Sequence, residues 1–309
     1  MKNKYLKYLL IFILVLVSMD KLIGIITESR LSLQTTGVIG IVNKTIKDSS
    51  DILILGSSRA QNHYNSQIIE KRTNQTIFNG GIGGTGIFYT YAVLKERFKL
   101  HKPKTVVLDV AANIMIDLKQ YDKLAMFHPL IKKYNAFDSI SNLNPNFKPF
   151  LTYSNAYRYN STTFEIFYDL ISPVNNNDAF IAVHGTLDQI QKLNEQERKQ
   201  SKIATNEYKL LIHQLEYIDK IKLLCQINNT ELLVFISPSF KESIKEVSAK
   251  SIIINHLKAK EIVFYDFSID QTFIDKNSLF KDLRHLNGKG ATIFSEEVAL
   301  IILEQKKSK

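Results

Sequence analysis

A serine, a histidine and an aspartate in this sequence stand in settings that suit acyl transfer. Ser58 comes directly after the apolar run 51–55 and a turn that begins with Gly56, so its hydroxyl is expected to be exposed beside backbone N–H groups. Asp282 precedes His285 by three residues, and at this spacing its carboxylate can hold the imidazole by Nδ1–H while Nε2 faces a serine. These residue types predict a nucleophile, a general base and the group that orients the base.

Two further segments carry groups that could stabilise a developing negative charge. The glycine-rich segment 79–86 follows a short apolar run, so its backbone can approach a ligand closely and donate an N–H. Asn113 follows another apolar run, at 105–109, and its side-chain amide is a second possible donor. In an open parallel sheet the ligand crevice lies beyond the carboxyl ends of the strands, so we expect these segments to lie near Ser58.

The order of apolar runs and helical patterns predicts the sheet that would position these residues. Short apolar runs, expected to be buried strands, lie at 51–55, 76–78, 105–109, 231–236 and 261–265. Between them the spacing of apolar residues is helical, as at 208–227, and a closing helix is expected at 290–304. This alternation predicts an α/β fold with a three-layer, doubly wound, parallel five-stranded sheet. Residues 117–205 are too many for one crossover and are expected to form an insertion.

Together these segments resemble the four sequence blocks of the SGNH (GDSL-type) hydrolases, which supply Ser, Gly, Asn and His in that order. The similar segments are GSS at 56–58, the glycine-rich segment at 79–85, LDVAAN at 108–113, and DLRH at 282–285, which LNGKGA follows. The resemblance covers roughly residues 50–115 and 260–304. It implies an SGNH-type, flavodoxin-like sheet and an acyl-serine mechanism.

The resemblance also implies a role for each matched residue. Ser58 is then the nucleophile, His285 the base and Asp282 the group that orients the base. The N–H groups of Ser58 and Gly84, together with the side-chain amide of Asn113, would form the oxyanion hole.

Three departures from the family pattern affect these assignments. Ser57 stands where the commonest family motif has Asp, a variant associated with members that act on envelope polysaccharides. Ala111 and Ala112 replace the usual small glycines, and Ile114 replaces the Asp that often follows the Asn. The last two bear on the placement of Asn113 more than on the identity of the triad.

The sequence leaves an alternative open for several of these residues. Ser58 could instead cap the helix that follows it, and Ser57 could be the nucleophile. Asn113 could be a turn residue that ends its strand. Arg59 could bind an anionic group of a substrate or pair with a local carboxylate.

The segment 81–86 also matches the dinucleotide-binding pattern G-x-G-x-x-G, with Asp109 about 20 residues further on. We rank this interpretation second, because it leaves Ser58, Asp282 and His285 without a function. A domain outside the cytoplasm would also not meet cytosolic dinucleotides.

The N-terminal sequence predicts the compartment. Three lysines within the first seven residues precede a long apolar run that is broken at Asp20 and the lysine after it. This pattern predicts an uncleaved signal anchor at 1–28, a stalk at 29–50 and an SGNH-like catalytic domain at 51–309. By the positive-inside rule, the catalytic domain would be extracytoplasmic, in the periplasm or at the cell surface.

The composition excludes several other classes of protein. The 309 residues are 45% hydrophobic and 23% charged, which excludes a mainly disordered chain. Cys225 is the only cysteine, so neither an internal disulfide nor a cysteine-based zinc site is expected. The net charge is +10, but only seven of the 40 basic residues are Arg and the lysines are scattered, which argues against nucleic acid. The histidines other than His285 lack paired ligand spacing, so no metal or cofactor is expected. His63 follows the serine turn closely and could line the pocket, but we expect it at the surface.

We therefore expect a membrane-anchored serine esterase or O-acyltransferase. It would act on acyl esters, expected to be acetyl esters, of an extracytoplasmic polysaccharide through an acyl-serine intermediate. Its partners would be the acylated glycan or a small acyl-ester substrate, the membrane through the N-terminal helix, and a membrane acyltransferase. The alternative is a catalytically inactive SGNH-like subunit that binds or assembles envelope polysaccharide, and reaction with a fluorophosphonate would separate the two.

Overall fold

The computed structural model describes residues 2–159, 162–171, 180 and 202–307. The chain divides into two compact units. We call Met1–Asn43 with Leu124–Asn176 the helical unit, and Lys44–Lys123 with Asn177–Lys309 the sheet unit.

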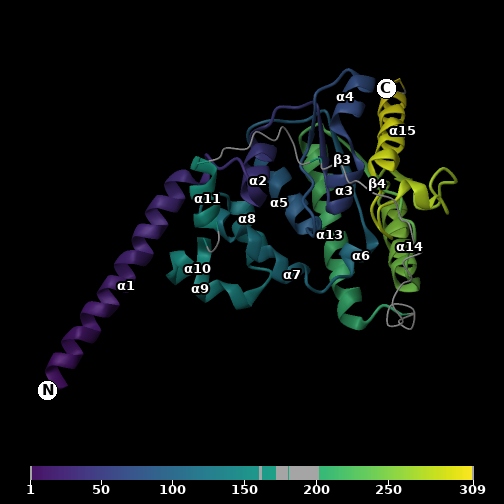
Figure 1. The fold of residues 1–309 in the computed structure, drawn as a ribbon. Coiled ribbons are helices and arrows are strands. Elements are labelled where there is room, and N and C mark those ends of the chain that lie inside the picture. The colour runs from purple at the N-terminus through teal and green to yellow at the C-terminus, as the bar shows by residue number, and fades with distance from the viewer. Residues whose placement is uncertain (1, 160–161, 172–179, 181–201, 308–309) are drawn as a thin grey trace. The chain divides into compact units, whose positions relative to one another are not determined.

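Five parallel strands form the sheet of the sheet unit. They are β1 (Ile52–Leu55), β2 (Ile77–Asn79), β3 (Thr105–Asp109), β4 (Glu231–Ile236) and β5 (Phe264–Asp266), in the order β2-β1-β3-β4-β5 (Figure 1). The order reverses between β1 and β3, as in doubly wound flavodoxin-like sheets. The predicted fold class, an α/β fold with a parallel five-stranded sheet, is therefore confirmed.

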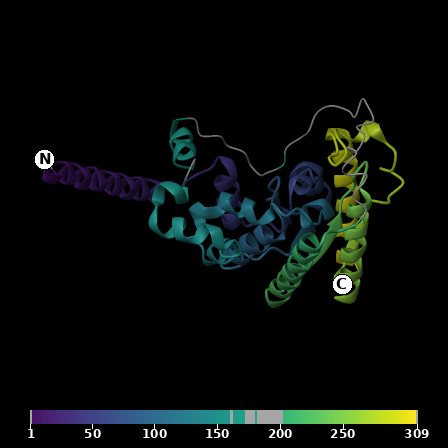
Figure 2. The ribbon, with the colours of Figure 1, turned by 90° about the horizontal axis from the view of Figure 1, so that it is seen from below.

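Helices cover both faces of this sheet (Figures 1 and 2). One face carries α3 (Ser58–His63), α4 (Ser66–Thr73) and α15 (Gly288–Lys307), and the other carries α5 (Ile87–Arg97), α13 (Thr205–Ile227) and α14 (Ile244–Ala259). On the α15 face, Ile54, Val107 and Leu233 pack in one buried cluster with Phe294 and Val298 of that helix. Because both faces are covered, all four residues of β1 are buried, and this explains its uninterrupted apolar sequence.

The predicted strand and helix positions hold to within a few residues. Among the strands the largest shift is at β5, which begins at Phe264 rather than at 261. The reason is the turn after α14, where Glu261 adopts a left-handed backbone conformation (φ 51°) that cannot belong to a strand. The helices expected at 208–227 and 290–304 begin two or three residues earlier, at Thr205 and Gly288.

The helical unit is built from a long N-terminal helix and several short ones. Its helices are α1 (Lys2–Leu31), most of α2 (Gly37–Lys47), η1 (Leu124–Leu130), α8 (Asn135–Ser141), η2 (Pro145–Phe147), α9 (Lys148–Tyr153), α10 (Asn155–Tyr159) and α11 (Thr162–Ile171). Helix α1 is long and apolar enough to cross a membrane, and its apolar side chains are exposed from Tyr5 to Met19.

Two predicted segments extend over more than one part of this architecture. The stretch 29–50, predicted as a stalk, contains α2, in which Ile39, Val42 and Ile46 are buried. Of the predicted insertion 117–205, residues 124–171 belong to the helical unit, whereas 172–179 and 181–201 lie outside the described residues. The predicted domain boundaries stay a prediction.

Candidate active site

Ser58 is the first residue of α3 and lies directly beyond the carboxyl end of β1. The turn between them requires glycine. Gly56 has φ +149°, and a Cβ there would lie 2.8 Å from the backbone oxygen of Asp109 and 2.9 Å from the Cβ of Ala60. Ser57 occupies the N-cap position with an extended backbone, so the helix starts at Ser58 and the Ser58 hydroxyl lies at the sheet edge. The side chain of Ser57 is buried, and its hydroxyl has no hydrogen-bond partner among the described residues.

The structure brings Ser58, His285 and Asp282 into one chain of hydrogen bonds. His285 Nε2 lies 2.8 Å from Ser58 Oγ, and His285 Nδ1 lies 2.9 Å from Asp282 Oδ2. The side chains of His285 and Asp282 are 26% and 35% exposed, so this chain is within reach of a ligand. With Nδ1–H donated to the carboxylate, Nε2 is left to accept the serine proton.

The carboxylate of Asp282 is held by its own turn. Its Oδ1 accepts the backbone N–H groups of Arg284 and His285, at 2.8 Å and 2.9 Å. Partial burial raises the pKa of Asp282, but the hydrogen bonds from the His285 side chain and from the backbone outweigh it and bring the pKa to about 2. The carboxylate is therefore ionised at neutral pH and fixed in orientation before any ligand binds.

His63 supports the turn that carries Asp282 and His285. It is fully buried, and its Nε2 accepts the backbone N–H of Leu286 at 3.1 Å. Burial and the nearby charge of Arg59 lower the pKa of His63 well below its ordinary value, so the ring is a neutral acceptor. The expectation that His63 lies at the surface is wrong, because α15 and the turn before it cover α3, and sequence spacing does not reveal that contact.

Gly84 lies in the loop after β2, which passes beside Ser58. A Cβ on the neighbouring Gly83 would lie 3.8 Å from the Cβ of Ser58. Gly84 itself has φ +78°, a left-handed conformation that favours glycine, and its carbonyl accepts Nε2 of Gln120 at 3.2 Å. Gln120 is buried in α7 (Gln120–Lys123). A residue from a distant part of the sequence therefore holds this loop in place.

Asn113 lies in the short helix α6 (Ala112–Met115), beyond the end of β3. Its Oδ1 accepts Nη2 of Arg59 at 3.4 Å, and Arg59 also donates to the backbone oxygen of Ser237 at 3.3 Å. Arg59 is buried beside Asp109, whose pKa is raised by burial and partly lowered by the Arg59 charge. Of the two interpretations of Arg59, the structure therefore favours the local one.

The glycine-rich loop does not offer an open phosphate site. A Cβ at Gly81 would lie 2.6 Å from the backbone nitrogen of Gln61, so this glycine allows the loop to pack on α3. At the start of α5, where a pyrophosphate would bind in a dinucleotide site, Oε1 of Gln214 accepts the N–H of Ile87 at 3.3 Å. The side chains of Gln120 and Gln214 also crowd Gly86. These contacts disfavour the dinucleotide interpretation.

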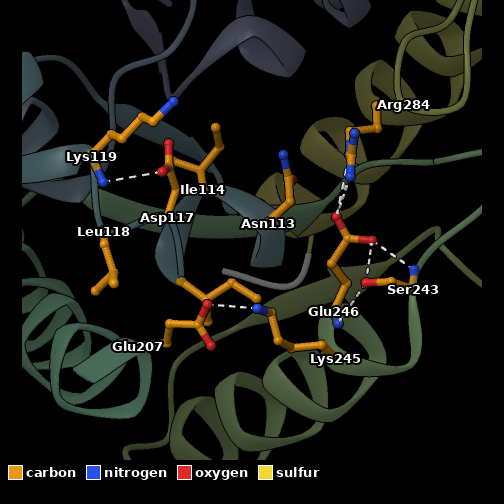
Figure 3. Close-up of a pocket in the computed structure, with 11 residues that line it drawn as sticks. Asn113, Ile114, Asp117, Leu118, Lys119, Glu207, Ser243, Lys245, Glu246 and Arg284 are labelled. Carbon is orange, nitrogen blue, oxygen red and sulfur yellow. Dashed lines mark hydrogen bonds and ion pairs between the residues drawn. The ribbon is translucent and has the colours of Figure 1, made fainter. Parts of the chain in front are cut away.

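A pocket of about 680 Å³ adjoins the site, and Figure 3 shows the side chains that line it. Asn113 and Arg284, the latter between Asp282 and His285 in the sequence, both belong to its wall. Eight of the 11 lining residues are polar or charged, although polar and apolar atoms share the surface of the pocket about equally. Two ion pairs join charged side chains of the wall. Lys245 lies 2.5 Å from Glu207, and Arg284 lies 2.8 Å from Glu246. The pocket therefore offers many hydrogen-bonding groups and little uncompensated charge.

Metal ligands and the cysteine thiol were the other candidates for chemistry, and neither contributes to this site. Among the described residues, no cluster of three or more His, Cys, Asp or Glu side chains could hold a metal ion. Cys225 is buried in α13, and burial raises the pKa of its thiol to about 12, which makes it a poor nucleophile.

No family model and no curated protein matches the chain. A similar solved structure is that of a protein assigned to the G-D-S-L family of lipolytic proteins, from Desulfitobacterium hafniense DCB-2. The two share 10% sequence identity with a TM-score of 0.42, over 81% of this chain and 98% of that one. The likeness is too low to carry an argument about activity, so the function must be argued from the site itself.

Proposed function

We propose that this protein is a serine ester hydrolase or O-acyltransferase in which Ser58 is the nucleophile, His285 the general base and Asp282 the residue that orients the base. The observation that carries the proposal is the continuous hydrogen-bond chain from Ser58 Oγ through His285 to Asp282. These three groups come from distant parts of the sequence, and a purely structural role for each would not require this order of contacts.

In the first step, Ser58 Oγ attacks the carbonyl carbon of an ester while His285 Nε2 takes the hydroxyl proton. The ionised Asp282 stabilises the imidazolium that forms. The tetrahedral oxyanion would be held by the N–H groups of Ser58 and Gly84 and by Nδ2 of Asn113, each worth on the order of 3 kcal/mol. Oδ1 of Asn113 accepts from Arg59, so Nδ2 is the atom of this amide that would donate to the oxyanion.

The second step completes the reaction. His285 returns its proton to the leaving alcohol oxygen as the carbon–oxygen bond breaks, which leaves an acyl-Ser58 ester. Water, or a hydroxyl group of an acceptor, then attacks this ester while His285 takes its proton. The bond between the acyl carbon and Ser58 Oγ breaks as His285 returns that proton to Ser58, which releases the acid or the acylated acceptor and restores the enzyme. Water gives hydrolysis and an acceptor hydroxyl gives transfer, so the same residues serve both activities.

We propose as substrate an acetyl ester of a polysaccharide outside the cytoplasm. The wall of the pocket supports a hydrophilic alcohol, because the paired charges, the Asn113 amide and the Ser243 hydroxyl can hydrogen-bond to sugar hydroxyls without requiring a charged ligand. The exposed apolar helix α1 supports a membrane-anchored protein, with the sheet unit on the extracytoplasmic side and a membrane acyltransferase as a candidate partner.

Acetate release from O-acetylated glycans and from p-nitrophenyl acetate tests the proposal. The full-length wild-type protein, Ser58→Ala and His285→Ala are compared, with Ser57→Ala as the matched serine control. We expect activity in the wild type and in Ser57→Ala, and a fall of about 10⁴-fold or more in the other two variants. Activity that survives both Ser58→Ala and His285→Ala overturns the site. Absence of activity in the wild type favours the inactive binding subunit.

A further inference from the structure

Helix α11 of the helical unit carries an apolar stripe that nothing in the described structure covers. Phe164, Phe167, Tyr168 and Ile171 occupy positions i, i+3, i+4 and i+7, which lie on one face of a helix. Their exposed fractions are 78%, 48%, 61% and 85%. Ile166, on the other face, is buried. A helix of a water-soluble domain normally turns such a stripe toward its core, so this stripe requires a different apolar environment.

The stripe belongs to a helix that packs against α1, the helix long and apolar enough to cross a membrane. Thr163 Oγ1 lies 3.0 Å from Thr27 Oγ1 of α1. Further along, Gln34 Nε2 donates to Glu165 Oε2 at 3.1 Å. The helix that carries the stripe therefore packs at the C-terminal end of α1, directly after the exposed apolar residues of α1, which end at Ile26.

The charged break in α1 is also explained by this packing. The carboxylate of Asp20 accepts the backbone N–H groups of Asn155 and Ala156, at 3.0 Å and 2.9 Å, and the hydroxyl of Ser154 at 3.0 Å. Asp20 thus caps the N-terminus of α10. A carboxylate with these partners is far less costly to place near lipid than an isolated one.

The length of α1 indicates how far the bilayer must reach. The exposed apolar stretch from Tyr5 to Met19 is about 22 Å long at 1.5 Å per residue, which is short of a hydrocarbon core of about 30 Å. Leu22, Ile25 and Ile26 are also exposed, and counting to Ile26 gives about 33 Å. A bilayer that matches α1 therefore extends past Asp20, where α10 packs, and ends near Ile26, next to the contact of α11 with Thr27.

We propose that α10 and α11 lie in the interfacial layer of the bilayer that α1 crosses, with the stripe of α11 facing the lipid acyl chains. The exposed Tyr153 and Tyr157, just before and within α10, suit the same layer, where tyrosine rings are favoured. This inference rests on the proposed membrane insertion of α1 and is independent of the proposed catalysis. The helical unit then contacts the membrane through α10 and α11 as well as through α1.

The absence of tryptophan from the sequence allows a direct test. Single-tryptophan variants of the full-length protein are reconstituted into phosphatidylcholine vesicles with or without lipids brominated along the acyl chain. Phe164→Trp and, as a second reporter, Ile171→Trp probe the stripe, and Leu14→Trp probes α1. Leu300→Trp, at an exposed position of α15, is the control in water. Circular dichroism and the thermal unfolding midpoint show that each variant is folded.

We expect bromolipid to quench Leu14→Trp strongly and the two stripe variants by about half, because an interfacial face lies ~5–10 Å deep, and to leave Leu300→Trp unquenched. Stripe tryptophans that are no more quenched than Leu300→Trp, while Leu14→Trp is quenched, overturn the proposal. A blue-shifted but unquenched stripe also overturns it, since a protein partner or a second copy would then cover the stripe. An unquenched Leu14→Trp removes the premise that α1 is inserted, and leaves the catalytic proposal to its own test.

Discussion

The candidate site has two sides that are held in place by different means. We call Asp282 and His285 the base side, and Asn113 and Gly84, the proposed oxyanion donors, the donor side. On the base side, Asp282 and His285 lie three residues apart, and most of their hydrogen bonds close within one turn. On the donor side, Asn113 is oriented by Arg59, which is 54 residues away in the sequence, and Gly84 by Gln120, which is 36 residues away.

The difference shows where the site is robust and where it depends on the rest of the fold. On the base side, hydrogen bonds within one short segment fix the positions of the catalytic groups, and α15 and His63 only support that segment. The donor side has its geometry only when the buried groups beneath it are in place. Substitutions on the base side should therefore remove chemistry outright, whereas substitutions beneath the donor side should remove only part of it.

After the losses expected for Ser58→Ala and His285→Ala, the largest expected effect is that of Asp282→Asn. The amide cannot hold Nδ1–H in the same way, so the imidazole is in the wrong tautomer and its positive charge is no longer stabilised. We expect kcat to fall by about 10³–10⁴-fold with KM little changed. Steady-state kinetics on p-nitrophenyl acetate measure this. A loss of less than about tenfold would show that the base side is not the dominant half of the site.

Asn113→Ala is expected to have the next largest effect. It removes one of the proposed oxyanion donors, which costs about 10²–10³-fold in kcat when the donor is used only in the transition state. KM should stay close to the wild-type value. An Asn113→Ala variant with wild-type kcat would mean that Asn113 is a turn residue only, and the donor side would then consist of backbone groups alone.

Arg59→Met should have a smaller effect, because it acts through Asn113. Without the guanidinium, the Asn113 amide can rotate, and we expect kcat to fall by about tenfold. In the double variant Arg59→Met, Asn113→Ala, kcat should be close to that of Asn113→Ala alone, since both changes remove the same interaction. Full additivity in this cycle would contradict the positioning role. Thermal unfolding of Arg59→Met distinguishes a local change from general destabilisation.

The smallest expected effect is on stability at acidic pH. The pKa of Asp282 is about 2 in the folded protein and about 3.9 in an unfolded chain, so its carboxylate stabilises the fold at a pH above about 4. This stabilisation is lost as the pH falls from about 4 to about 2. The difference in unfolding free energy between wild type and Asp282→Asn should shrink over that interval. Urea titrations at several pH values measure it, and a constant difference would contradict the hydrogen-bonded carboxylate.

The sequence predicts the sheet well because each strand is a short apolar run, and a run buried on both faces is readable without knowing its neighbours. It also predicts which polar residues follow the strands, and therefore the meeting of Ser58 with His285. The contacts of Arg59, His63 and Gln120 could not be predicted in this way. Each depends on which helix packs above which loop, and an isolated Arg, His or Gln has no pattern that names its partner.

The N-terminal region shows the same limit. The apolar run predicts a membrane helix, and Asp20 looks like a defect in it when the run is read alone. Its partners at the start of α10 lie about 135 residues further along the chain, in a segment with no recognisable motif. The exposed stripe of α11 could have been noticed from its i, i+3, i+4, i+7 spacing, but spacing alone predicts a buried face rather than an exposed one.

Labelling with a serine-directed fluorophosphonate, followed by mapping of the modified peptide, tests the central claim most directly. The probe reacts with a serine only when an adjacent base activates it. We expect wild type and Ser57→Ala to be labelled on Ser58, His285→Ala to react far more slowly, and Ser58→Ala not to react at all. A wild-type protein that is not labelled, or a label that persists in Ser58→Ala, would contradict the claim that Ser58 is an activated nucleophile.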